Sequence, residues 1–176
     1  MKLLARGLEA VLQAITACLL LALAAVVVLA VAFRTLGSSL IWYDEVAAIM
    51  LAWLTYYAAA LAALRRAHMG FSGLLFALPL ALRRALFLLA EALVLGFFLV
   101  VAWYGWTVME FMAGETLVSL PWVSVPFTQS VIPVAAALFV LAEIASLPEA
   151  WANLTAGRSA EDIEIEQALA DAGHHR

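Results

Sequence analysis

The hydrophobic residues of this chain are concentrated in four long stretches, which cover residues 11–33, 46–64, 85–109 and 127–147. The hydrocarbon core of a bilayer is about 30 Å thick, and a helix needs about 20 residues to cross it. A helix suits this environment because its backbone groups are hydrogen-bonded within the segment. We therefore predict an all-α integral membrane protein with four transmembrane helices.

The connections between these stretches predict further organisation. Residues 71–84 carry leucines at helical spacing but are too few to cross the membrane, so we expect an amphipathic interfacial helix between the second and third spans. Residues 110–129 are unusually apolar for a loop and are expected to lie against the membrane or a partner, with re-entry into the membrane as the alternative. Residues 1–156 form a single membrane domain in this interpretation, and residues 157–176 form an acidic cytoplasmic tail.

The composition excludes several classes of protein. Hydrophobic residues make up 67% of the chain and charged residues 12%, whereas a soluble domain is about 25% charged. The net charge is −4 and no basic block is present, so nucleic acid is not an expected partner. One cysteine and three histidines without ligand spacing predict no metal, cofactor or disulfide. No nucleophile is paired with a base, so we do not expect an enzyme.

The distribution of lysine and arginine predicts the orientation of the chain. Summed over alternate connections, 8 of the 9 basic residues fall on one side and only Arg34 on the other. Because basic residues are retained on the cytoplasmic side, we expect both termini in the cytoplasm. Four arginines between the second and third spans are expected to contact anionic membrane lipids: Arg65, Arg66, Arg83 and Arg84.

Two carboxylates fall within the predicted spans. Glu91 is seven residues after Arg84, and Glu143 is eight residues before Trp151, so at 1.5 Å per residue both lie about 10–12 Å from the cytoplasmic side. Such groups are candidate intramembrane polar contacts, paired with an arginine or a hydroxyl of a partner or with each other through a proton. A role in binding a transported ion or proton is the alternative.

The second span carries the most informative pattern. Carboxylates at its start and arginines at its end match the helix dipole and anchor both ends at an interface. Small residues at spacings of three and four, from Ala48 to Ala63, suit close contact with another helix. The candidate subunit-interface or anchoring residues here are Trp42, Asp44, Glu45, Trp53, Arg65, Arg66 and His68.

The order of these residues resembles the small membrane subunit, of the DctQ type, of tripartite ATP-independent periplasmic (TRAP) transporters. The resemblance continues in Leu-Pro-Leu-Ala-Leu-Arg-Arg at residues 78–84 and in Gly114, Leu120-Pro121 and Ile132-Pro133, and covers about residues 12–147. Asp44 stands where glutamate is common in that family. The resemblance implies a location in a bacterial inner membrane. It also implies a large ion-coupled permease subunit as partner and a periplasmic binding protein that delivers a carboxylate or sugar acid.

Two functional hypotheses follow. In the first, the chain is a scaffold for the large subunit, and Glu110 and Glu115 on its acidic outer side contribute to docking of the binding protein. In the second, the chain is a self-sufficient four-helix proton-coupled exporter that uses Glu9 of the first helix. The strong bias in basic residues and the long connections favour the first hypothesis.

Overall fold

The computed structural model describes residues 2–66 and 78–157, and this part of the chain is helical without strands. Four long helices are present, each long and apolar enough to cross a membrane, which confirms the predicted fold class. They are α1 (Lys2–Thr35), α2 (Tyr43–Leu64), α4 (Leu80–Phe111) and α6 (Val131–Ala156), and a short helix α5 (Val125–Gln129) precedes α6.

The helices are longer than the apolar stretches that predict them. Helix α1 begins nine residues before residue 11, and α6 continues through Pro148 to Ala156, where Gly157 ends it in the left-handed conformation with φ 73°. Helix α4 begins directly after Pro79. Of the predicted interfacial helix, residues 71–77 lie outside the described residues, and residues 80–84 form the first turn of α4.

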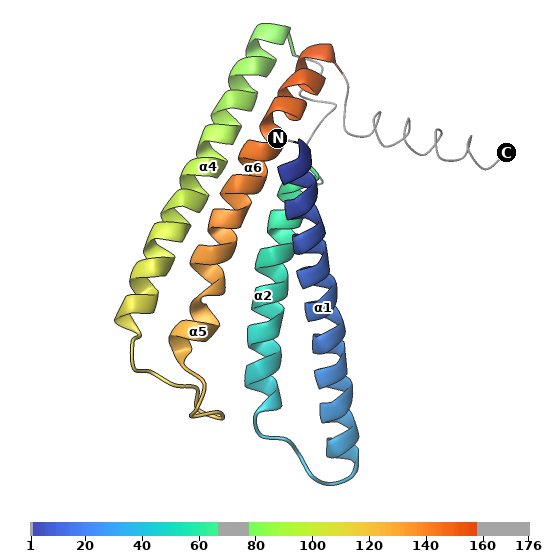
Figure 1. The fold of residues 1–176 in the computed structure, drawn as a ribbon, viewed down its shortest axis with the longest axis vertical. Helices are drawn as coiled ribbons and strands as arrows, with labels where there is room; N and C mark the ends of the chain where they lie inside the picture. Colours follow the sequence, from blue (N-terminus) through green and yellow to red (C-terminus); the bar gives the residue numbers. More distant parts are fainter. Residues whose placement is uncertain (1, 67–77, 158–176) are drawn as a thin grey trace, which may run out of the picture.

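The four long helices run alternately up and down, in the spatial order α4, α6, α2, α1 (Figure 1). Helix α6 packs between α2 and α4, and α1 packs on the far side of α2. The two ends of the bundle differ in composition. We call the end with Arg65, Arg66, Arg83 and Arg84 the arginine end, and the end with residues 36–42 and 112–124 the loop end.

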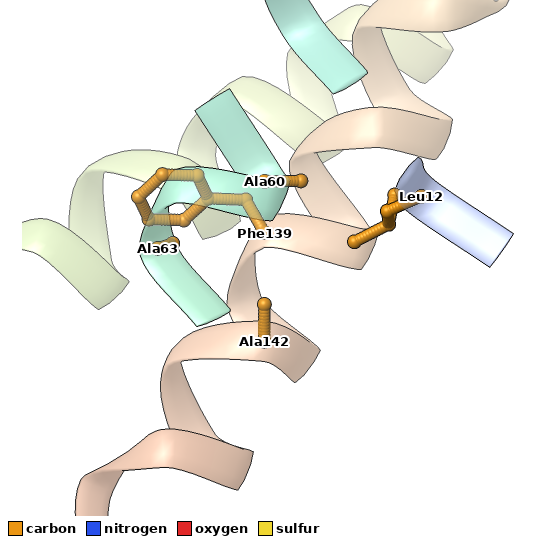
Figure 2. Close-up of a cluster of buried hydrophobic side chains, with 5 residues drawn as sticks. All are labelled: Leu12, Ala60, Ala63, Phe139 and Ala142. Atoms are coloured by element: carbon orange, nitrogen blue, oxygen red, sulfur yellow. The ribbon is translucent and has the colours of Figure 1, made fainter. Parts of the chain in front are cut away.

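Burial is concentrated on α6. In its most apolar 18-residue stretch 44% of residues are buried, compared with 6–11% in the other three helices. The interior is made of small side chains, with Ala60 and Ala63 of α2 facing Phe139 and Ala142 of α6, and Leu12 of α1 closes the cluster (Figure 2). Small residues allow helix backbones to approach closely, which is the usual basis of packing in lipid.

A second close contact joins α4 to α6 nearer the loop end. A Cβ atom on Gly105 would lie 2.9 Å from the Cγ2 atom of Ile132 and 3.2 Å from the Cδ atom of Pro133. The first turn of α6 therefore packs directly against the backbone of α4. Most large apolar side chains point away from the bundle, as lipid or a partner subunit would require.

Candidate functional site

At the loop end, Glu45 in the first turn of α2 binds the connection between α4 and α5. Its carboxylate accepts hydrogen bonds from the backbone N–H groups of Val118 (3.3 Å) and Ser119 (2.9 Å) and from the Ser119 hydroxyl. An isolated antiparallel β-bridge pairs Thr116 with Ser124 within the same connection. The sequence predicts only that Glu45 interacts favourably with the dipole at the start of its helix. In the structure it also holds a loop that lies more than 70 residues away in the sequence.

Trp53 makes the next contact along α2. Its indole nitrogen donates to the backbone carbonyl of Thr128 in α5 (2.8 Å), and its ring lies 5.4 Å from the Phe127 ring, measured between centroids. The indole N–H of a partly buried tryptophan usually finds such an acceptor. Trp53 therefore positions α5, and with it the start of α6, against α2.

The charged residues of the arginine end meet around Arg66, which follows the C-cap of α2 with φ 52°. The backbone of Arg66 is therefore in the left-handed conformation, which glycine usually adopts after the end of a helix. The Nη1 atom donates to Glu143 (2.7 Å) and to Glu91, the Nε atom donates to the Ser146 hydroxyl (2.8 Å), and Nη2 donates to the Glu143 carbonyl (3.3 Å). We call these four residues the Arg66 cluster.

The Arg66 cluster is buried between three helices. Glu91 of α4 is 8% exposed and Glu143 of α6 is 7% exposed, and Ser146 is also buried. Charged groups are removed from water at a large cost unless they are paired and hydrogen-bonded. The shared guanidinium supplies that pairing and joins the end of α2 to both α4 and α6.

The neighbouring arginines are used differently. Arg65 binds Glu9 of α1 at 2.8 Å and lies 3.4 Å from the Gln13 side-chain oxygen, in a pair whose side chains are 45% and 37% exposed. Arg83 donates to the Leu154 carbonyl, and Arg84 lies over the Trp151 ring. The sequence predicts a lipid-facing group of four arginines, whereas Arg66 turns into the bundle.

The remaining predicted site residues lie apart from this cluster. Trp42 occupies the N-cap position of α2 and Asp44 is exposed. Glu110 accepts a hydrogen bond from the Trp106 indole (2.8 Å), and Glu115 is exposed nearby in the sequence on the loop end. His68 lies outside the described residues.

The sequence predicts that Glu91 and Glu143 lie at a similar depth, but it does not predict that both bind Arg66. The residues that it misses are Ser119 and Thr128, which bind α2 at the loop end, and Ser146. Only Ser146 has a local signal, since it follows Glu143 by three residues and so lies on the same helix face. The other two are identified by contacts between distant segments.

The structure also contains a shallow groove between α2 and the junction of α5 with α6. Its volume is about 240 Å³, and its walls include Ala48, Ala52, Thr128 and Ile132. None of the described residues that line it is charged. Among residues 2–66 and 78–157, no three His, Cys, Asp or Glu residues lie together as metal ligands would.

Two comparisons with known proteins bear on this arrangement. A search of curated proteins finds no match. The sequence model of the family described as tripartite ATP-independent periplasmic transporters, DctQ component, matches residues 23–153. That range includes α2, α4 and almost all of α6, and with them Glu45, Trp53 and the Arg66 cluster. Since the match extends over well more than half of the chain, this protein belongs to the DctQ family of TRAP transporter small membrane subunits.

Proposed function

We propose that this chain is a fixed scaffold for the large, ion-coupled permease subunit of a TRAP transporter. One observation carries the proposal. The four buried polar side chains of the described residues, Glu91, Thr128, Glu143 and Ser146, all bind groups of the same chain, while the apolar outer faces of α1, α2 and α4 are open. The polar groups hold the helices together, and the apolar faces are left for contact with lipid and a partner.

The same residues offer little to a transported solute. Secondary transporters bind cargo near the midplane, between helices that are interrupted there. The break between α5 and α6 at Ser130 lies toward the loop end, and the groove beside it lacks charged walls. A carboxylate or sugar acid would find no cationic partner in this groove, which supports cargo binding by the large subunit instead.

We assign the exposed small residues of α2 to the contact with the large subunit. Ala60 and Ala63 are buried against α6, but Ala48, Ala52 and Thr55 on the same helix are exposed. Two of these exposed residues also line the groove beside α5. A helix of the partner can approach closely along such a surface, because small side chains bring backbones together.

In this proposal the loop end faces the periplasm, and both termini face the cytoplasm. The N-terminal end of α1 and the C-terminal end of α6 lie at the arginine end of the bundle (Figure 1). The bias in basic residues assigns that end to the cytoplasmic side of the inner membrane. The periplasmic binding protein, carrying a carboxylate or sugar acid, would then meet Glu110 and Glu115 at the loop end.

The alternative, a self-sufficient exporter that uses Glu9, is less well supported. Glu9 is bound to Arg65 at the arginine end rather than facing a central cavity. A proton-carrying carboxylate needs access to both sides of the membrane, and an exposed ion pair at one rim does not provide it.

Reconstitution of the full-length chain tests the scaffold proposal. Liposomes that contain the small subunit, the large subunit and the binding protein are expected to accumulate substrate along an ion gradient, and omission of the small subunit should abolish uptake. Liposomes that contain the small subunit alone should be inert. Solute movement driven by this chain alone would overturn the proposal.

A matched pair of variants tests the assigned face. Ala52→Trp places a bulky side chain on the exposed strip of α2, whereas Leu21→Trp does so at a 71% exposed position of α1. Overpacking costs about 1–3 kcal/mol. We therefore expect Ala52→Trp to weaken co-purification with the large subunit by about tenfold. Leu21→Trp should leave co-purification unchanged, and equal effects of the two variants would remove α2 from the interface.

A further inference from the structure

The Arg66 cluster contains more negative than positive charge. Two carboxylates, on Glu91 and Glu143, contact the same Nη1 atom of a single guanidinium. Both glutamates are more than nine-tenths buried. If both were ionised, the cluster would carry one uncompensated negative charge at a depth where uncompensated charge is costly.

The other described charges around the cluster are bound to different groups. From α2, Arg65 pairs with Glu9 of α1. From α4, Arg83 donates to backbone carbonyls of Leu78 and Leu154, and Arg84 lies over a tryptophan ring. From α6, Glu149 is exposed. Within residues 2–66 and 78–157, Arg66 is the basic group that contacts the two buried carboxylates.

The hydrogen bonds of the two carboxyl groups leave room for a proton. The Oε2 atom of Glu91 is buried and has no hydrogen-bond partner in the described part of the chain. An oxygen of Glu91 and an oxygen of Glu143 contact the same nitrogen atom of Arg66, so the two carboxyl groups lie close together. Like charges this close disfavour the doubly ionised pair, and a proton on either carboxyl group both removes the excess charge and supplies a donor.

We propose that Glu91 and Glu143 together bind one proton, so that the Arg66 cluster is a neutral, proton-loaded junction between α2, α4 and α6. The proton belongs to the pair rather than to one residue, as is usual for strongly interacting acids. It exchanges with water on the arginine end, where the Arg66 side chain is 27% exposed. This inference is independent of the scaffold proposal and of the identity of the partner subunit.

The sign of the resulting pH dependence follows from linkage. The folded chain holds a proton that exposed glutamates release at neutral pH, so the folded state binds more protons than the unfolded state. Folding stability should therefore decrease as the pH rises through the point at which the pair loses its proton. Loss of the proton leaves the excess negative charge between α4 and α6 and loosens that junction.

Infrared spectroscopy of the full-length chain in lipid nanodiscs measures the proton directly. A protonated carboxylic acid has a carbonyl-stretch band that is separate from that of a carboxylate and shifts in heavy water. At neutral pH the wild-type chain should show this band, and the band should disappear on titration to alkaline pH. A wild-type spectrum without it would overturn the proposal, since both carboxylates would then be ionised.

Substitutions assign the band to the pair. Glu91→Gln and Glu143→Gln should each abolish it, because the remaining carboxylate then pairs alone with Arg66. Arg66→Gln should roughly double it, since two buried carboxylates without a cation each take a proton. Glu9→Gln is the matched control, because Glu9 belongs to an exposed pair with its own arginine, and the band should be unchanged. A band that survives in both cluster glutamine variants would also overturn the proposal.

Discussion

At the arginine end, the Arg66 guanidinium, just after α2, links buried carboxyl groups on α4 and α6. At the loop end, the Glu45 carboxylate of α2 binds the backbone of residues 118–119. The first contact is buried and joins three helices. The second lies beside exposed apolar side chains, among them Val118 at 93% and Trp122 at 80% exposure. The comparison indicates that buried ion pairs hold the helices together at the arginine end, whereas the loop end leaves large apolar side chains exposed.

The largest effect should come from Arg66→Ala. This variant leaves Glu91 and Glu143 buried without their cation, and removing one partner of a buried ion pair costs about 3–5 kcal/mol. Alanine and arginine are similarly strained in the left-handed conformation at φ 52°. The decrease in stability therefore reports the loss of the Arg66 side-chain contacts. Thermal unfolding in detergent measures the change.

Arg65→Ala is the neighbouring control for that experiment. Its pair with Glu9 is exposed, and such pairs contribute about 0–1 kcal/mol. Similar losses of stability in the two variants would show that burial does not distinguish the two arginines, and the contrast between the ends of the bundle would fail.

The next effect should come from Gly105→Ala, nearer the loop end. The added Cβ atom would lie 2.9 Å from Ile132 and close to the ring of Pro133, so α4 and α6 must separate. Overpacking of this kind costs about 1–3 kcal/mol. On the same helix, Gly96→Ala meets no atom within 4 Å and should be neutral or slightly stabilising. Equal melting temperatures for the two variants would contradict close packing at Gly105.

A smaller and local effect is expected from Glu45→Gln. The neutral amide oxygen is a weaker acceptor for the N–H groups of Val118 and Ser119, so their hydrogen exchange should become several-fold faster. Melting temperature should change little, because the arginine end remains intact. Asp44→Asn, at the exposed neighbouring position, should leave exchange at these two amides unchanged. Unchanged hydrogen exchange at Val118 and Ser119 in Glu45→Gln would argue against these hydrogen bonds between Glu45 and the loop.

The smallest structural effect should come from neutralising Glu110 and Glu115 together. Both are exposed at the loop end, and stability should not change. If they contribute to docking of the binding protein, uptake should be slower and less sensitive to salt, since charge on an interface rim acts mainly on association. Glu149→Gln at the other end is the control. Unchanged uptake in the double variant would exclude these two residues from docking.

Several features could be predicted from the sequence because they depend on composition along the chain. Four apolar stretches are enough to predict four spanning helices, and the regular rise of a helix places Glu91 and Glu143 at one depth. The family resemblance depends on the order of several residues within a four-helix chain, and the match over residues 23–153 confirms it. These residues are Trp42, Asp44, Glu45, Trp53, Arg65, Arg66 and His68.

The partners of those residues were decided only by the tertiary structure. A spanning helix is apolar on every face, so its sequence does not show which face packs on a neighbour, and the central position of α6 has no periodic signal. Arg65 and Arg66 are adjacent and chemically identical, but they bind different partners. Arg65 binds Glu9, whereas Arg66, which has a left-handed backbone, binds Glu91 and Glu143. Such pairings depend on the distances between side chains of different helices, and the sequence of one helix does not show them.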